Sequence, residues 1–176
     1  PGGSGALRLA GEFIARNLPG RGVWLSDPTW PIHETLFAEA GLKVGHYPYV
    51  GADNRLDVEA MIAALAHLPK GDVVLLHACC HNPTGADLTD AQWREVIGVL
   101  AERSLFPFID MAYQGFDRGI DADAAAVRLL AIFLIALPEV AGIAVGMDMI
   151  VDSVLIIPLT LFLAERAARA GDGGTA

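Results

Sequence analysis

Polar side chains follow two apolar runs in the middle of the chain. Residues 73–76 lead into a polar stretch that contains Asn82 and a Pro-Thr-Gly turn, and residues 106–109 lead into Asp110 and Tyr113. Short apolar runs bounded by turn residues are typical of buried strands. Ligands of open α/β sheets bind beyond the carboxyl ends of the strands, so we expect Asn82, Asp110 and Tyr113 to converge on one small molecule.

Each of these residues also has an ordinary structural interpretation. An Asn before Pro-Thr-Gly often builds a turn, and an Asp at a strand end often caps the next helix. The residue types alone therefore leave both interpretations open.

A second candidate site lies at the start of the chain. Gly2-Gly3-Ser4-Gly5 precedes a helical pattern over residues 2–18, in which Ala6, Ala10 and Phe13 share one face. A glycine loop that opens a helix presents free backbone N–H groups and the positive end of the helix dipole, which together hold a phosphate. Taken alone, the four residues are equally consistent with a flexible linker.

Strand and helix patterns alternate between these candidate sites. Strands are predicted at residues 22–25, 42–49, 72–76 and 106–110, and helices at residues 32–40, around 58–65 and from 90 onward. This alternation predicts an α/β fold with three layers, in which helices cover both faces of a mainly parallel sheet.

Two of these helices have clear start signals. Asp57 is placed to cap the first, and Thr89 with Gln92 forms a capping box for the second. Leu88 and Trp93 flank that box as a hydrophobic staple. We therefore interpret Trp93 as a core residue and not as a site residue.

Four segments together resemble the class I aspartate and aromatic amino-acid aminotransferases, which use pyridoxal phosphate. They are Pro1-Gly-Gly-Ser-Gly-Ala-Leu-Arg8, Ser26-Asp-Pro-Thr-Trp-Pro-Ile-His33, His81-Asn-Pro-Thr-Gly85 and Asp110-Met-Ala-Tyr-Gln-Gly-Phe116. They occur in the order of the family and span residues 1 to about 128. The resemblance implies part of the large domain of a fold-type I pyridoxal phosphate enzyme over residues 1–128. Residues 129–176 do not match.

The resemblance also assigns a role to individual residues. It implies cofactor contacts from Gly3, Ser4, Trp30, Asn82, Asp110 and Tyr113, of which Trp30 and Asn82 would also meet the substrate. Asp110 would keep the ring nitrogen of the cofactor protonated, because a nearby carboxylate favours the charged form. His33 and His77 would orient Asp110, and Ala112 would pack under the ring. His33 could instead be a surface histidine at the start of its helix.

The lysine that forms the Schiff base in this family has no counterpart here. The chain contains only Lys43 and Lys70, which both precede the Asn-Pro-Thr-Gly turn. The C-terminal arginine that holds the substrate carboxylate is also missing. We therefore expect a fragment of an aminotransferase that does not turn over amino acids alone, and we assign no catalytic residue. In the intact homodimer the substrates would be an amino acid, aspartate-like or aromatic, and a 2-oxo acid.

The net charge and the cysteines of the chain indicate which partners and which cellular compartment to expect. The 176 residues carry a net charge of −9, which argues against nucleic acid as a partner. Cys79 and Cys80 are adjacent and are expected to be reduced thiols in a cytoplasmic protein. They cluster with His77 and His81, but no second Cys or His pair stands at zinc spacing, so we predict no metal site. The thiols are better interpreted as small buried hydrophobes.

The C-terminal part has a different composition. Residues 129–163 contain no Lys or Arg and three acids, and residues 129–147 approach the roughly 20 apolar residues that cross a bilayer. We expect a hydrophobic, helical tail, and membrane contact only through these residues. Three interpretations stay open: a frame-shifted translation, a fusion to a membrane segment, and a buried helical pair. The fusion would make the protein a membrane-associated or transport fragment, with Glu139, Asp148 and Asp152 as candidates for an ion path.

Overall fold

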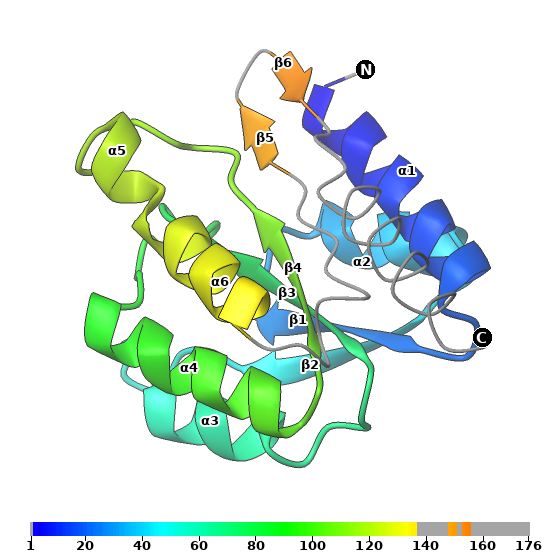
Figure 1. Ribbon diagram of the computed structural model, residues 1–176, viewed down its shortest axis with the longest axis horizontal. Helices are drawn as coiled ribbons and strands as arrows, with labels where there is room; N and C mark the ends of the chain where they lie inside the picture. Colours follow the sequence, from blue (N-terminus) through cyan, green and yellow to red (C-terminus); the bar gives the residue numbers. More distant parts are fainter. Residues whose placement is uncertain (1, 137–147, 151–152, 156–176) are drawn as a thin grey trace, which may run out of the picture.

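Four parallel strands form the central sheet of this computed structural model, which describes residues 2–136, 148–150 and 153–155 (Figure 1). The strands are β1 (Gly22–Asp27), β2 (Lys43–Pro48), β3 (Val73–His77) and β4 (Phe106–Asp110), in the spatial order β2-β1-β3-β4. All three neighbouring pairs are parallel. Every strand therefore ends at the same edge of the sheet.

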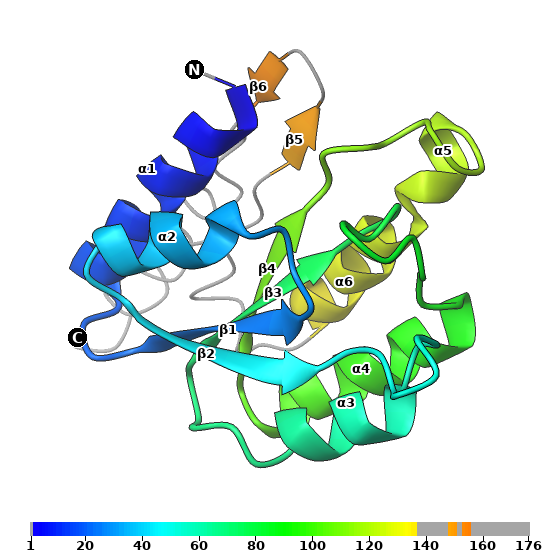
Figure 2. The same cartoon turned by 180° about the vertical axis from the view of Figure 1, so that it is seen from behind.

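Helices cover both faces of this sheet. Helices α1 (Gly2–Asn17) and α2 (Ile32–Glu39) pack together on one face, whereas α3 (Val58–Leu65), α4 (Asp90–Glu102) and α6 (Ala125–Ala136) lie on the other (Figures 1 and 2). The short helix α5 (Ile120–Asp123) lies beyond the carboxyl end of β4. This arrangement confirms the predicted three-layer α/β fold with a parallel sheet.

The central strand β3 shows why the apolar runs become strands. Val73 and Leu75 belong to the core cluster under α1 and α2, whereas Val74 and Leu76 belong to the cluster under α3, α4 and α6. All four side chains are buried. Successive strand residues point to opposite faces, so a strand covered on both sides is apolar throughout and does not alternate.

Both predicted helix starts are present. The Asp57 carboxylate accepts a hydrogen bond from the backbone N–H of Ala60 at the start of α3. Thr89 and Gln92 form the reciprocal capping box of α4. Leu88 and Trp93 are both buried in the same core cluster, which supports the structural interpretation of Trp93.

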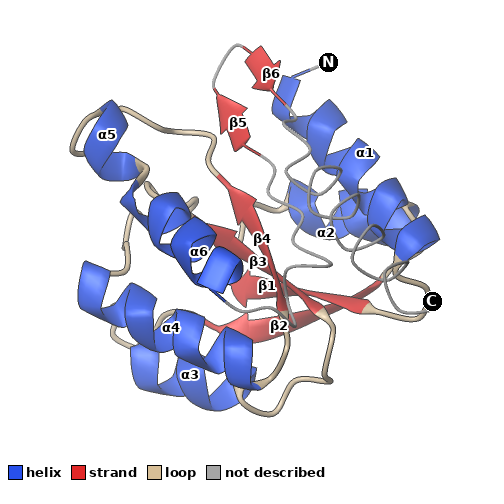
Figure 3. Ribbon diagram, viewed as in Figure 1, coloured by secondary structure: helices blue, strands red, loops and turns tan. Residues whose placement is uncertain are grey.

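The prediction of a helical tail is wrong where the structure describes the tail after α6. Strands β5 (Asp148–Ile150) and β6 (Ser153–Leu155) form an antiparallel pair (Figure 3). Short apolar runs cannot be assigned to helix or strand by periodicity alone, and β-branched residues such as Ile150 and Val154 favour strands.

Helix α6 runs across the expected domain boundary at residue 128. Within the described residues, no helix is both long and apolar enough to cross a membrane. The membrane alternative therefore has no support from this part of the chain, and the remainder of the tail, with Glu139 and Asp152, lies outside the described residues. The domain boundary itself stays a prediction.

Candidate functional site

A cavity of about 240 Å³ opens at the carboxyl edge of the sheet. Its wall is formed by the first turns of α1, the loop after β1, and the last residues of β3 and β4 with the segments that follow them. The lining residues are Gly3, Ser4, Leu7, Trp30, His77, Cys79, Asn82, Asp110, Ala112 and Tyr113. Of the nine candidate site residues predicted from the sequence, eight thus line one cavity, and His33 lies behind Asp110.

Asp110 is the charged group at the centre of this wall. It is 7% exposed, and its Oδ2 atom lies 3.1 Å from Nε2 of His33 and 3.7 Å from Nε2 of His77. His33 is fully buried, and its Nδ1 atom is 2.8 Å from Oγ1 of Thr29. The interpretation of His33 as a surface histidine is therefore wrong, because the start of α2 turns this side chain towards the sheet. Thr29, His33 and Asp110 form one hydrogen-bonded chain.

His77 reaches the same carboxylate from the neighbouring strand. The last residues of β3 and β4, His77 and Asp110, are register partners, so their side chains emerge together. The ring of His77 stacks on that of His33 at 5.4 Å, yet neither of its buried nitrogens has a hydrogen-bond partner among the described residues. Burial, with smaller contributions from nearby charges, lowers the pKa of His77 to about 3. His77 is therefore neutral at pH 7.

Asn82 and Tyr113 approach each other on the opposite side of the cavity. The amide nitrogen of Asn82 lies 3.5 Å from the phenolic oxygen of Tyr113, and Tyr113 is 41% exposed. An amide N–H and a phenol O–H are both donors, so the pair can meet one ligand oxygen. Such a contact is the role that the resemblance implies for both residues.

Two carboxylates, those of the half-buried Asp87 and the buried Asp123, hold the loops that carry this pair. The Asp87 carboxylate accepts hydrogen bonds from the backbone N–H groups of Cys80 and His81, just before Asn82. The Asp123 carboxylate accepts three from residues 115, 117 and 118, just after Tyr113. Burial tends to raise the pKa of Asp123, but these three donors outweigh it and the pKa is lowered.

His81 ties the turn at Asn82 to neighbouring segments through hydrogen bonds of its ring. Its Nε2 atom lies 2.9 Å from Oγ of Ser26 and its Nδ1 atom 2.8 Å from Oγ1 of Thr84. Tyr49 stacks on the ring at 3.9 Å. Burial lowers the pKa of His81 to about 4, so this ring is also neutral at pH 7.

The predicted phosphate loop is the first turn of a helix. Helix α1 begins at Gly2, so Gly3 and Ser4 lie within its first turn and not in a separate loop. The first four N–H groups of a helix have no intrahelical acceptor. Gly3 and Ser4 line the cavity, so the positive end of the helix dipole lies at its wall, where it suits an anion.

Sequence reasoning missed some residues of the site and its support. Leu7 and Cys79 line the cavity, and Thr29 anchors His33. Leu7 lies one helical turn after Gly3 and could have been found from that spacing. The only local signal for the Thr29 contact is a hydroxyl four residues before His33. Both cysteines are free, and Cys79 is buried in the core cluster as well as at the cavity wall.

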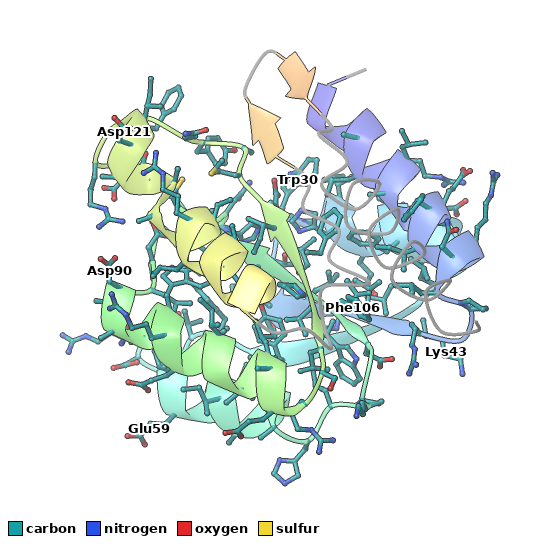
Figure 4. All side chains as sticks on the ribbon, in the orientation of Figure 1. Trp30, Lys43, Glu59, Asp90, Phe106 and Asp121 are labelled. Carbon is teal, nitrogen blue, oxygen red and sulfur yellow. The ribbon has the colours of Figure 1, made fainter. Side chains whose placement is uncertain are left out.

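Neither lysine of the chain lies at this cavity. Lys43 begins β2 and Lys70 precedes β3, so both stand at the amino edge of the sheet, opposite the site. Figure 4 shows Lys43 well separated from Trp30, which lines the cavity. Among the described residues, the cavity therefore combines a helix start that suits an anion, two hydrogen-bond donors and a buried carboxylate, with no lysine on its wall.

Comparisons with known proteins place the chain in a family. A family model described as aminotransferase class I and II matches residues 1–154. The aromatic-amino-acid aminotransferase of Pseudomonas aeruginosa is 71% identical over 140 residues, which are 80% of this chain and 34% of that protein. The aspartate aminotransferase of Escherichia coli is 48% identical over 132 residues, or 74% and 33% of the two chains.

Solved structures agree with these matches. The aromatic aminotransferase of Burkholderia pseudomallei, described as covalently bound to pyridoxal phosphate, has a TM-score of 0.73 and 51% identity, over 74% of this chain and 33% of that one. The chain spans about a third of the length of the curated relatives it matches. It belongs to the aminotransferase class I and II family.

Proposed function

We propose that this chain supplies the cofactor-binding part of a pyridoxal phosphate-dependent aminotransferase. The whole protein would transfer an amino group between an amino acid and a 2-oxo acid. The observation that carries the proposal is the convergence on one cavity of eight residues that are spread over four separate segments of the sequence. A structural reason for any one of them does not explain their joint position.

Each part of the cavity suits one part of the cofactor. The N–H groups at the start of α1, with Ser4, would bind the phosphate. Asn82 and Tyr113 would donate to the phenolic oxygen of the ring, and the indole of Trp30 and the small Ala112 would contact its faces. Asp110 would hold a proton on the ring nitrogen. When bound, the protonated ring supplies an electron sink for the carbanion that forms during amino-group transfer.

His33 and Thr29 have a positioning role in this proposal. A buried carboxylate must be oriented as well as charged, and the chain from Thr29 through His33 fixes one oxygen of Asp110. The other oxygen is then free for the ring nitrogen. The low exposure of Asp110 excludes water and strengthens this charge pairing.

The substrate of the whole protein would be an aromatic amino acid, with an aspartate-like one as the alternative. The relative with 71% identity is named for aromatic amino acids, whereas the aspartate enzyme reported above is 48% identical. We also propose that the whole protein works as a cytoplasmic homodimer. The chain by itself would not turn over substrate, because it lacks a lysine at the site.

Titration of the full chain with pyridoxal phosphate tests the proposal. We expect saturable binding that is followed by the absorbance of the cofactor. Asp110→Asn keeps the shape of the side chain but removes its charge, and hydrogen bonds to charged groups contribute about 1.5–3 kcal/mol, so we expect binding at least about tenfold weaker. Asp90→Asn is the matched control, because Asp90 is exposed on α4 and points away from the cavity (Figure 4).

Two results would count against the proposal. Equal affinity of the wild type and Asp110→Asn would show that the cofactor binds elsewhere. Turnover of phenylalanine and 2-oxoglutarate by the purified chain would refute the statement that it needs a lysine from outside the sequence.

A further inference from the structure

His33, His77 and Asp110 form a cluster of potential metal ligands. One ligand atom from each residue lies within 4.8 Å of the other two. The three side chains are 0%, 5% and 8% exposed. This is not the Cys and His cluster that the sequence suggested, and only His77 is common to both.

The separations are close to those of a coordinated ion. Oδ2 of Asp110 lies 3.1 Å from Nε2 of His33 and 3.7 Å from Nε2 of His77. Zinc bonds of about 2.0–2.1 Å in a tetrahedron place neighbouring ligand atoms about 3.3 Å apart. Small side-chain movements would therefore bring all three atoms into a first coordination shell.

His77 gives an independent indication of an absent partner. Both of its ring nitrogens are buried without a hydrogen-bond partner among the described residues, and Nε2 points at the carboxylate. Buried polar atoms in folded proteins are nearly always paired, so an unpaired imidazole beside a carboxylate calls for a ligand. His33, in contrast, has the supporting contact that metal-binding histidines usually have, from its Nδ1 atom to Thr29.

We propose that His33, His77 and Asp110 bind a borderline divalent cation, Zn²⁺ being the best fit, when the cavity contains no cofactor. Two imidazoles and one carboxylate leave a fourth position open. His77 and Asp110 both line the cavity, so that position faces it and would hold water. Three protein ligands with an open fourth position are typical of reactive zinc sites and not of structural ones.

The ion would occupy the place that the proposed function gives to the ring nitrogen of the cofactor. Asp110 cannot serve both at once, so metal and pyridoxal phosphate should compete. This competition rests on the proposed function, but binding of the metal does not. The two ideas can therefore fail separately.

Cobalt is the probe that tests the site, because tetrahedral Co²⁺ absorbs in the visible range whereas Zn²⁺ does not. We expect the metal-free full chain to bind about one equivalent of Co²⁺, and Zn²⁺ to displace it. His77→Asn and Asp110→Asn should each weaken Co²⁺ binding by more than about tenfold, since loss of even an outer-shell partner costs about 10–100-fold. His67→Asn is the matched control, because His67 is exposed and its ring bonds to the carbonyl of Ala63, away from the cavity residues.

The thiol of Cys79 at the cavity wall is the competing ligand. A strong near-ultraviolet band from cobalt bound to sulphur would overturn the proposal, as would equal binding by all variants. X-ray absorption of the Zn²⁺-loaded wild type gives a readout that needs no variant. It should show nitrogen and oxygen neighbours at about 2.0–2.1 Å, and a sulphur shell at about 2.3 Å would again contradict the site.

Discussion

The Nε2 atom of His33 lies 3.1 Å from Oδ2 of Asp110, although the two residues are 77 positions apart in the chain. The contact joins the first turn of α2 to the last residue of β4. It is buried at both ends, so solvent does not screen it. The position of Oδ2 of Asp110 in the cavity therefore depends on how the loop after β1 positions His33.

Replacing His33 should weaken cofactor binding through Asp110. His33→Leu retains bulk but leaves the carboxylate without its hydrogen bond, and we expect the dissociation constant of pyridoxal phosphate to rise by about tenfold, equivalent to about 1.4 kcal/mol. His33→Gln keeps a donor and should recover part of that loss. Absorbance titration of both variants measures the difference, with the exposed His46→Gln as control. An equal loss of cofactor affinity in His33→Leu and His33→Gln would mean that His33 acts through packing alone.

Two tryptophans should separate cofactor binding from stability. Trp93 is 3% exposed in the core cluster, so Trp93→Phe should lower the free energy of unfolding by about 1–3 kcal/mol and leave cofactor affinity unchanged. Trp30 is partly exposed at the cavity, so Trp30→Phe should weaken binding and change stability less. Urea denaturation gives the free energy of unfolding of each variant, and titration gives its affinity for the cofactor. The assignment of the two roles fails if Trp93→Phe alone weakens binding.

Asp123 should stabilise the loop that follows Tyr113. Its buried carboxylate accepts three backbone N–H groups, and Asn offers one oxygen and turns an N–H towards the remaining donors. Asp123→Asn should therefore cost about 2–3 kcal/mol of unfolding free energy. Asp121→Asn on the same short helix is the control, because the side chain of Asp121 is 95% exposed. Urea denaturation of the two variants compares them, and equal midpoints would contradict the role of Asp123.

The sequence predicted the sheet and the ends of its strands because those signals are local. The apolar run of β3 and the capping box of Thr89 depend on residues within one element. The cavity followed from a general rule, that parallel strands present their ends at one edge. The roles of Gly3, Asn82 and Tyr113 came from resemblance and stay predictions, whereas their common position is a property of the structure.

Contacts between distant elements could not be predicted in the same way. The bond between Ser26 and His81 and the approach of His77 to Asp110 require the register of three strands. The local sequence around His77 suggested Cys79, Cys80 and His81 as its companions. The ring of His77 does pack against that of His81, at 4.3 Å, but it also stacks on the ring of His33 at 5.4 Å. That second contact joins the end of β3 to the start of α2, and only the tertiary structure shows it.

The two buried histidines should make stability depend on pH. Burial lowers the pKa of His77 to about 3 and that of His81 to about 4, whereas both are near 6.5 in an unfolded chain. Between pH 6.5 and about 4 the unfolded chain therefore binds protons that the folded chain does not. The free energy of unfolding should fall as the pH falls through this window, by about 1.4 kcal/mol per pH unit for each histidine, and these two residues should add no slope above pH 7.

Urea denaturation at several pH values, with the wild type and His81→Gln, isolates this effect. The carboxylates contribute equally to both proteins, so the difference in slope belongs to the histidine. We expect His81→Gln to reduce the slope between pH 6.5 and 4.5 by about 1.4 kcal/mol per pH unit. His67→Gln removes an exposed histidine between α3 and β3, and it should leave the slope of the wild type unchanged. Parallel curves for the wild type and His81→Gln would mean that His81 takes up its proton without unfolding, and that the contacts with Ser26 and Thr84 hold the charged ring as well as the neutral one.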